Sequence, residues 1–285
     1  MLKNSAAYLV RRAEEKLIDA ACPDPRTDAL LLAQETLGMT RIQLRFDGDK
    51  IPDLQRRKAF DAALERRLSG EPLQHILGTT WFMGLCFRTD KRALIPRQDT
   101  ETVVETAVSL LKDSNAGASL LDLCSGSGCI GLSLAKLRPG LRVTLSDISP
   151  AALELSKENA ALLGVNAEFI ESDMFSRHKG RQYDFIISNP PYIPECELGQ
   201  LQKELSFEPQ NALNGGGDGL DFYRRIAEEA PDYIKAGGRL ILEIGAGQAE
   251  AVCGLLEAAF DCITTTEDLN GIERVVSARR KEWQT

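Results

Sequence analysis

The 285-residue sequence predicts an α/β protein, in which a mostly parallel sheet follows a small all-helical domain. From residue 119 onward, short apolar segments alternate with amphipathic ones, as expected when strands and helices take turns along the chain. Two of the apolar segments close on an acidic residue, and another runs into two consecutive prolines. Residues 5–68 show only the helical spacing of apolar side chains.

The N-terminal part carries clear helix boundary signals. Asp24 followed by Pro25 is typical of an N-cap and a first-turn proline, and Gly38 is suited to end the same helix. Helices are expected near residues 5–21, 25–37, 40–45 and 52–68. Because this region carries no catalytic constellation, we expect residues 1–75 to form a helical substrate-recognition domain; the alternative is a stabilising appendage.

Residues 76–95 change in character and are predicted to form a β-hairpin linker. Strand-like segments at 81–87 and 93–95 are separated by the polar stretch 88–92. The catalytic domain is then expected to cover residues 96–285, with its first helix capped at Asp99 or Thr100.

The strands expected in the catalytic domain are short and apolar, as in sheets covered on both faces. An antiparallel hairpin is expected at one edge of the sheet, because the last two strands are joined by only a few residues. The predicted strands are 120–123, 142–146, 168–171, 185–187, 239–244, 261–267 and 273–279.

The composition excludes several classes of protein. A net charge of −8 argues against an electrostatic grip on nucleic acid, so no direct nucleic-acid binding is expected. The sequence has no signal-peptide core or membrane-spanning apolar run, and its 7 cysteines are an odd number without a C-x-x-C pair, which favours reduced thiols in a cytoplasmic protein. His75 and His178 are the only histidines, and no metal site is predicted.

The glycines after the first strand indicate an adenosine-containing cofactor. Gly126, Gly128 and Gly131 spell G-x-G-x-x-G, and Asp147 follows about 20 residues later, as in dinucleotide sites. Acidic strand ends at Asp122 and Asp173 favour S-adenosylmethionine over NAD, because a carboxylate can face an ammonium or sulfonium group, whereas a dinucleotide site needs room for pyrophosphate. The expected cofactor contacts are Asp122, Cys124, Ser125, Gly126, Ser127, Gly128, Asp147, Ile148, Asp173, Met174 and Asn189.

A second motif, Asn189-Pro190-Pro191-Tyr192, stops an apolar strand at its carboxyl end. The prolines fix the backbone path, so an amide, a carbonyl and an aromatic ring are held within four residues. This set suits a planar NH2 group and is similar to the motif of methyltransferases that modify amino groups of adenine, guanine or glutamine. We expect Asn189, Pro190 and Tyr192 to be catalytic, and these three with Pro191 and Glu208 to contact the substrate.

With these motifs placed, nearly the whole chain resembles the bacterial peptide chain release factor N5-glutamine methyltransferases, the HemK family. It departs from the family pattern at His75, where tyrosine is commoner, and at Gln98, where proline is commoner. The matching segments are 70–74, 76–78, 94–101, 122–128, 189–192, 207–209, 212–213, 218–221 and 242–245.

The resemblance implies a Rossmann-like methyltransferase sheet and methylation of the glutamine side chain in the Gly-Gly-Gln loop of release factors, with S-adenosylmethionine as methyl donor. The chain is expected to act as a monomer. Three alternatives stay open: a ribosomal-protein glutamine methyltransferase, a nucleic-acid amino methyltransferase, and a catalytically silent cofactor-binding scaffold. A nucleic-acid enzyme would call for a basic recognition region, which the sequence lacks.

Overall fold

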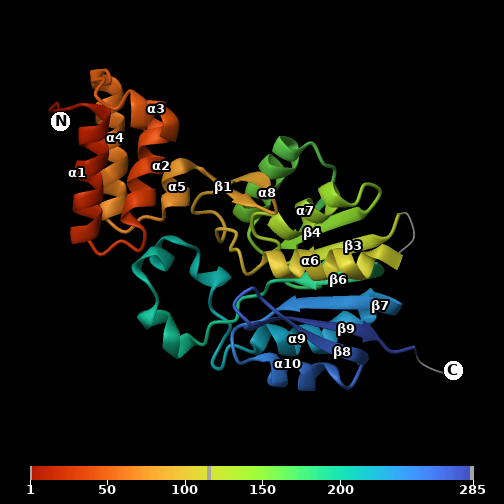
Figure 1. Ribbon diagram of the computed structural model, residues 1–285. Helices are drawn as coiled ribbons and strands as arrows, with labels where there is room; N and C mark the ends of the chain where they lie inside the picture. Colours follow the sequence, from red (N-terminus) through yellow and green to blue (C-terminus); the bar gives the residue numbers. More distant parts are fainter. Residues whose placement is uncertain (1, 114–116, 283–285) are drawn as a thin grey trace. The chain divides into compact units, whose positions relative to one another are not determined.

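The computed structural model describes residues 2–113 and 117–282, which form two compact units. The first unit contains Met1–Gly78 together with Gln202–Phe207, and the second contains Thr79–Leu201 and Glu208–Thr285. Figure 1 follows the chain from its helical N-terminal part into the sheet. Among the described residues, no helix is long and apolar enough to span a membrane.

The first unit is helical, as predicted, and its helix starts follow from local capping. Asp24 accepts a hydrogen bond from the Thr27 N–H, while Thr40 and Gln43 form a capping box. Apolar side chains such as Leu32 and Phe60 fill the core between the helices. The helices are α1 (Ala6–Asp19), α2 (Pro25–Leu37), α3 (Arg41–Phe46), α4 (Leu54–Leu68) and α5 (Leu73–Leu77), of which α5 was not predicted.

The predicted β-hairpin exists, but its strands were placed wrongly. β1 (Thr79–Phe82) and β2 (Leu85–Arg88) pair antiparallel around a tight turn at Met83-Gly84. Both turn residues have positive φ, 51° and 71°, which matches the twist that two-residue hairpins require. The apolar run 81–87 therefore folds back on itself, and residues 93–95 are not a strand.

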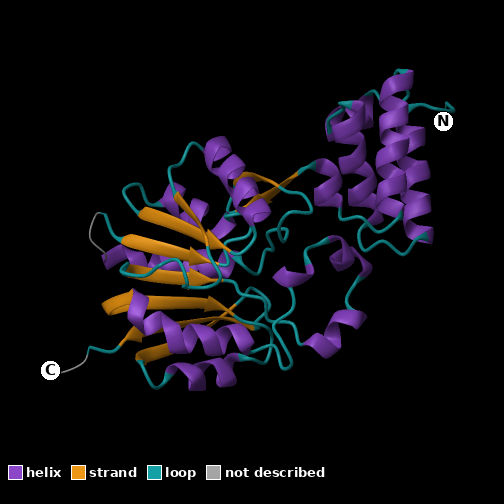
Figure 2. Ribbon diagram, turned by 180° about the vertical axis from the view of Figure 1, so that it is seen from behind, coloured by secondary structure: helices purple, strands orange, loops and turns teal. Residues whose placement is uncertain are grey.

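The second unit is built on one seven-stranded sheet with the order β5-β4-β3-β6-β7-β9-β8. The first five of these run parallel, whereas β9 pairs antiparallel with both β7 and β8. Figure 2 shows the parallel arrows pointing the same way, and the last two strands form the predicted edge hairpin. The strands are β3 (Ser119–Leu123), β4 (Arg142–Asp147), β5 (Glu168–Glu171), β6 (Tyr183–Ser188), β7 (Ile234–Glu243), β8 (Phe260–Glu267) and β9 (Glu273–Arg280).

Helices cover both faces of this sheet, and the alternation of side chains along each strand supplies both cores. Leu120 packs with α6, α7 and α8, whereas its neighbour Leu121 packs with α9 and α10. The helices are α6 (Glu101–Leu110), α7 (Cys129–Leu137), α8 (Pro150–Leu163), α9 (Asp221–Tyr233) and α10 (Ala249–Leu256). Short 3-10 turns follow α6 and occupy the segment after β6: η1 (Leu111–Asp113), η2 (Glu195–Gln200), η3 (Lys203–Phe207) and η4 (Gln210–Ala212).

The strand order reverses direction at β3. The chain proceeds from β3 outward to β4 and β5, then returns to place β6 on the other side of β3. In open α/β sheets, ligands bind outside the carboxyl ends of the strands at such a switch point. Asp122, Asp147, Asp173 and Asn189 lie at or near these ends.

Candidate active site

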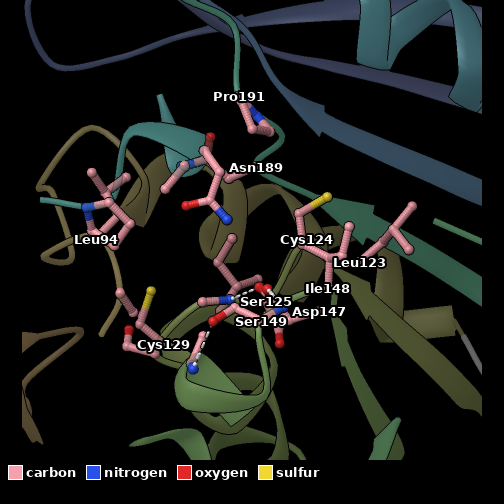
Figure 3. Close-up of a pocket in the computed structure, with 18 of the residues that line it drawn as sticks. Leu94, Leu123, Cys124, Ser125, Cys129, Asp147, Ile148, Ser149, Asn189 and Pro191 are labelled. Atoms are coloured by element: carbon pink, nitrogen blue, oxygen red, sulfur yellow. Dashed lines mark hydrogen bonds between the residues drawn. The ribbon is translucent and has the colours of Figure 1, made fainter. Parts of the chain in front are cut away.

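A cavity of about 340 Å³ opens at the carboxyl ends of β3, β4 and β6. Figure 3 shows Asn189 on one side of it and Ser125 and Asp147 on the other. Most of the residues predicted from the sequence to form the site line this cavity: Cys124, Ser125, Gly126, Ser127, Asp147, Ile148, Asp173, Met174, Asn189 and Pro191. Five others do not line it: Asp122, Gly128, Pro190, Tyr192 and Glu208.

The turn after β3 is shaped by its glycines. Gly126 has a φ of 54° and forms part of the cavity wall. Gly128 has a φ of 79°, and a Cβ there would lie 2.7 Å from Leu145 Cδ2, so this glycine lets α7 approach β4 closely. Gly128 therefore supports the turn from behind, although the sequence predicted it as a cofactor contact.

Asp147 is held rigidly at the end of β4. Its Oδ2 accepts the Gly126 N–H at 2.8 Å, and its Oδ1 accepts the Ser149 N–H at 2.9 Å. Burial raises the pKa of this carboxyl, while the backbone N–H donors oppose that shift. Each carboxylate oxygen keeps a further lone pair, so the group can accept hydrogen bonds from ligand hydroxyls.

Asp122 does not face the cavity, contrary to the prediction. Its side chain is 1% exposed, and Oδ2 accepts the Gly131 N–H at 2.8 Å at the start of α7. A Cβ on Gly131 would lie 2.9 Å from this oxygen, so glycine is needed for the contact. Burial raises the pKa of Asp122 to about 7. The free N–H groups of the first helical turn attract the carboxylate, so Asp122 stabilises the turn after β3.

The tetrapeptide Asn189–Tyr192 is divided between the cavity and its support. Asn189 and Pro191 line the cavity, and Asn189 Nδ2 lies 3.4 Å from Thr100 Oγ1. Pro190 is buried. Tyr192 packs against the core under α9 and α10, and its carbonyl accepts a hydrogen bond from Gln248 Nε2 at 3.0 Å. Burial raises the pKa of the Tyr192 hydroxyl to about 12, so it stays protonated at neutral pH.

Comparison with known proteins identifies the family. A protein-family model described as "Methyltransferase small domain" matches residues 102–220, and a second one, "PrmC N-terminal domain", matches residues 9–78. The release factor glutamine methyltransferase of Geobacter sulfurreducens is 41% identical over 266 residues, covering 92% of each chain. That of Chlorobaculum tepidum is 39% identical, covering 97% of this chain and 95% of the relative. The chain belongs to the release factor glutamine methyltransferase family.

A solved structure agrees on the fold. A methyltransferase from Pyrococcus furiosus is 14% identical, with a TM-score of 0.51 over 70% of this chain and 91% of the other. At that identity the similarity concerns the fold alone. It supports the predicted Rossmann-like architecture of the second unit.

Several residues that line the cavity were not predicted from the sequence to belong to the site. The segment from Arg92 to Arg97 forms one wall, and Phe222 and Arg225 of α9 contribute another part. Arg225 Nη1 donates to Asp173 Oδ1 at 2.9 Å. The 92–97 wall had a signal in the sequence, because residues 94–101 match a family segment, but they were assigned only to the linker and a helix cap.

Glu208 is buried behind the cavity wall. Its Oε2 accepts the Ile95 N–H at 2.9 Å, and its Oε1 pairs with the Arg97 guanidinium. The side chain has no exposed area. Arg97 and Pro209 both line the cavity. Glu208 therefore connects the wall segment that contains Ile95 and Arg97 to the one that contains Pro209. Its placement favours a supporting role over the direct substrate contact predicted from the sequence.

Both ring nitrogens of His178 have hydrogen-bond partners in the core of the second unit. His178 is buried, with Nε2 3.0 Å from Ser146 Oγ and Nδ1 2.8 Å from the Tyr183 hydroxyl. Burial lowers the pKa of His178 to about 4, so the ring is neutral near pH 7. Within the described ranges, no group of three or more His, Cys, Asp or Glu residues is arranged to hold a metal ion.

Proposed function

We propose that this chain transfers a methyl group from S-adenosylmethionine to the side-chain amide nitrogen, N5, of the glutamine in the Gly-Gly-Gln loop of peptide chain release factors. The observation that carries the proposal is the position of Asn189. It faces Asp147 across one cavity, in a chain that is 41% identical over 92% of its length to a release factor glutamine methyltransferase. Fold and family support the methyl donor, and the amide of Asn189 supports an N–H-bearing acceptor.

The cavity suits S-adenosylmethionine in its chemistry. Its volume of about 340 Å³ is within the usual range for small-molecule sites. Asp147 would accept the ribose hydroxyls, and the apolar side chains of Ile148 and Met174 would pack against adenine. Gly126 has no Cβ, and one built there would meet only Ala93 Cβ, at 3.9 Å, so the wall is open for close approach of the cofactor. The cofactor supplies an electrophilic methyl group on a sulfonium ion.

The reactivity of the substrate amide depends on how the chain orients it. An amide nitrogen is a poor nucleophile because its lone pair is delocalised into the carbonyl group. The Oδ1 atom of Asn189, which lines the cavity, would accept one N–H of the glutamine. The carbonyl oxygen of Pro190, a buried residue behind the lining, is the second acceptor that the sequence predicts. This holds the lone pair along the line of attack, and orientation of this kind can lower a displacement barrier by several kcal/mol.

The same acceptors stabilise the charge that develops. Positive charge grows on the nitrogen as the new bond forms, and two preorganised oxygens favour it over the neutral ground state. The apolar side chains of Pro191 and Leu94 on the cavity wall would help to exclude water from the reacting atoms. No base is required before the transfer, because the nitrogen becomes acidic only after it has been methylated.

The remaining assignments follow from this function. We propose that residues 1–75 recognise the protein substrate, that the chain acts as a monomer without binding nucleic acid, and that it works in the cytoplasm, where release factors act. The family match over residues 9–78 supports a role for the helical unit specific to this family. The net charge of −8 supports a protein substrate over nucleic acid.

The deciding experiment uses the purified protein with recombinant release factor and S-adenosylmethionine. We expect mass spectrometry of the Gly-Gly-Gln peptide to show one methyl group on the glutamine. Ribosomal proteins and a DNA or RNA duplex serve as competing substrates in the same assay. Methylation of either of these, with an unmodified release factor, would refute the proposal, as would calorimetry showing NAD binding without a response to S-adenosylmethionine.

A further inference from the structure

Glu243 is the last residue of β7 and lies beside Asn189, outside the cavity. The parallel register pairs Ser188 of β6 with Leu242 of β7, so Asn189 and Glu243 leave neighbouring strands at the same edge. Glu243 is only 3% exposed, and its Oε2 atom is buried without a hydrogen-bond partner within the described part of the chain. A buried carboxylate oxygen without a hydrogen-bond partner destabilises the folded state, so its presence here needs an explanation.

Two side chains of the cavity wall face this carboxyl. Thr100, at the N-cap of α6, is 2% exposed, and its Oγ1 lies 3.4 Å from Asn189 Nδ2. Burial raises the pKa of Glu243 to about 7, and hydrogen bonding to Thr100 and Asn189 opposes the shift. Asn189, Thr100 and Glu243 therefore form one polar cluster that leads from the cavity wall to the end of β7.

The two ends of the Asn189 amide have opposite hydrogen-bonding roles. Nδ2 can only donate and Oδ1 can only accept, whereas the glutamine NH2 of the substrate offers only donors. Catalysis by the proposed function therefore needs Oδ1 turned into the cavity. An ionised carboxylate only accepts hydrogen bonds, so it attracts Nδ2 and leaves Oδ1 facing the substrate.

We propose that Glu243 is a positioning residue, which fixes the orientation of the Asn189 amide directly and through Thr100. This inference rests on the proposed function for its catalytic consequence, although the contact itself does not. In the protonated form Glu243 has an O–H that can donate to Oδ1 of Asn189 and stabilise the reversed amide. The active orientation is then the one present when Glu243 is ionised.

The surroundings of Glu243 contain both signs of charge. Arg274 of β9 favours its ionised form, and Asp99 opposes it. The hydroxyl pKa values of Tyr192 and Tyr223 and the thiol pKa of Cys129 are each raised in part by Glu243. Since these three groups stay neutral near pH 7, Glu243 is the member of this cluster expected to change its charge there.

The contact can be tested without any measurement of activity. The 15N side-chain amide resonance of Asn189, assigned by its loss in Asn189→Ala, should shift with pH around a midpoint near 7. In Glu243→Gln, which keeps the shape and removes the charge, the shift should disappear. Glu267→Gln, which changes an exposed glutamate at the end of β8, is the matched control and should retain it.

The catalytic consequence is tested by single-turnover methylation of release factor with saturating cofactor between pH 6 and 8. The wild-type rate should rise by up to about tenfold, because one unit below its pKa only about a tenth of a carboxyl is ionised. Glu243→Gln should be slower at pH 8 and independent of pH, with cofactor affinity within about twofold of wild type. Thr100→Val should also be slow, and Thr100→Ser should restore the rate.

The outcomes separate this proposal from the proposed function. A pH step retained in Glu243→Gln assigns the titration to another group, such as Asp122, whose pKa is also about 7, and refutes the positioning role. An Asn189 resonance that ignores pH refutes the contact. A wild-type protein that leaves release factor unmodified while the resonance shifts as expected refutes the proposed function and leaves the contact in place.

Discussion

Arg67 in α4 and Glu204, 137 positions later in the chain, form a salt bridge in which Nη2 lies 2.5 Å from Oε1. Arg67 is buried, with 5% of its side chain exposed, and its Nε also donates to Asp28 Oδ2 at 2.6 Å. Glu204 lies on η3, in the stretch between the tetrapeptide at Asn189 and Glu208, which is buried behind the cavity wall. The helical unit thereby holds part of the segment that leads from the tetrapeptide Asn189–Tyr192 to the cavity wall.

This relationship predicts different effects for its two partners. Arg67→Met should lower the free energy of unfolding of the helical unit by about 3 kcal/mol or more, because it leaves the buried Asp28 without its charge partner. Glu204→Gln should cost less than about 1 kcal/mol, since the Glu204 side chain is 29% exposed and Asp28 keeps Arg67. Urea unfolding measures both effects.

Glu204→Gln should instead reduce the stability of its own segment only. Hydrogen exchange of residues 202–207 should become faster while α1 and α2 keep their protection. Glu15→Gln, which breaks an exposed pair with Arg11, is the control and should change neither measurement. Equal destabilisation by Glu204→Gln and Arg67→Met would contradict the assignment of Asp28 as the costly buried partner.

Local patterns in the sequence predicted most of the fold, because caps and strand ends are encoded by neighbouring residues. Asp24-Pro25 and Ser149-Pro150 both begin helices in the structure, at α2 and α8. The order of the expected strands along the chain and the final antiparallel hairpin were also confirmed. Helix α5 was missed because its five residues are too few to show a period.

The parts of the site that were missed depend on contacts between distant positions. The wall at Ile95 is held by a hydrogen bond to Glu208, 113 positions away. The sequence around each of these residues gives no indication of this contact. Asp122 was assigned to the cavity from its place at a strand end. Its direction is decided instead by the Gly131 N–H, whose geometry exists only once the turn after β3 has folded.

The exposed surface of α3 offers a test of substrate recognition by the helical unit. Ile42 and Phe46 are 71% and 79% exposed, and both line a surface groove together with Arg41 and Arg45. Phe46→Ala should raise KM for intact release factor by about tenfold, as for loss of one apolar anchor at an interface, and leave kcat unchanged.

The peptide substrate separates recognition from catalysis. With a short Gly-Gly-Gln peptide, which is too small to reach a second contact surface, Phe46→Ala should behave as wild type. Leu269→Ala, which truncates a fully exposed leucine in the β8–β9 turn, is the control for surface hydrophobicity. If Phe46→Ala has wild-type KM for intact release factor, this face of α3 is not the recognition surface.

The raised pKa of Asp122 predicts how stability depends on pH. The native carboxyl has a pKa of about 7, above the ordinary value of 3.8, so between these values the native state binds more protons than the unfolded state. The free energy of unfolding therefore falls as pH rises from about 4 to about 7, by up to roughly 4 kcal/mol from this group alone. Above pH 7 its contribution is constant.

Asp122→Asn should remove this slope, since its amide oxygen can still accept the Gly131 N–H but does not titrate. Urea unfolding of wild type and variant at pH 5 and pH 7.5 measures the effect, and the variant should gain stability relative to wild type at the higher pH. Comparing the two proteins cancels the titration of other carboxyls, Glu243 included. An unchanged slope would mean that Asp122 is ionised in the native protein throughout this range.

The sharpest prediction concerns Asn189, because its amide is the group that the proposed function places against the substrate nitrogen. Asn189→Ala should lower the single-turnover rate by about 100-fold or more, comparable to the loss of one preorganised transition-state partner. Cofactor affinity and thermal stability should stay close to wild type, since the amide supplies no core packing. Methyl transfer from labelled S-adenosylmethionine to release factor measures the rate, and calorimetry measures the affinity.

Asn189→Asp separates hydrogen-bond acceptance from shape. Aspartate keeps an acceptor of nearly the same size, so it should retain more activity than alanine if acceptance of the glutamine N–H is what matters. Its carboxylate would lie beside that of Glu243, and two neighbouring carboxylates disfavour being ionised together. This variant should therefore be most active at a pH at which the pair carries a single negative charge. Tyr192→Phe should be mild, because the ring packs against the core and lies outside the cavity wall. A near-normal single-turnover rate in Asn189→Ala with saturating cofactor would reduce the tetrapeptide to a structural turn, and the catalytic assignment would fall with it.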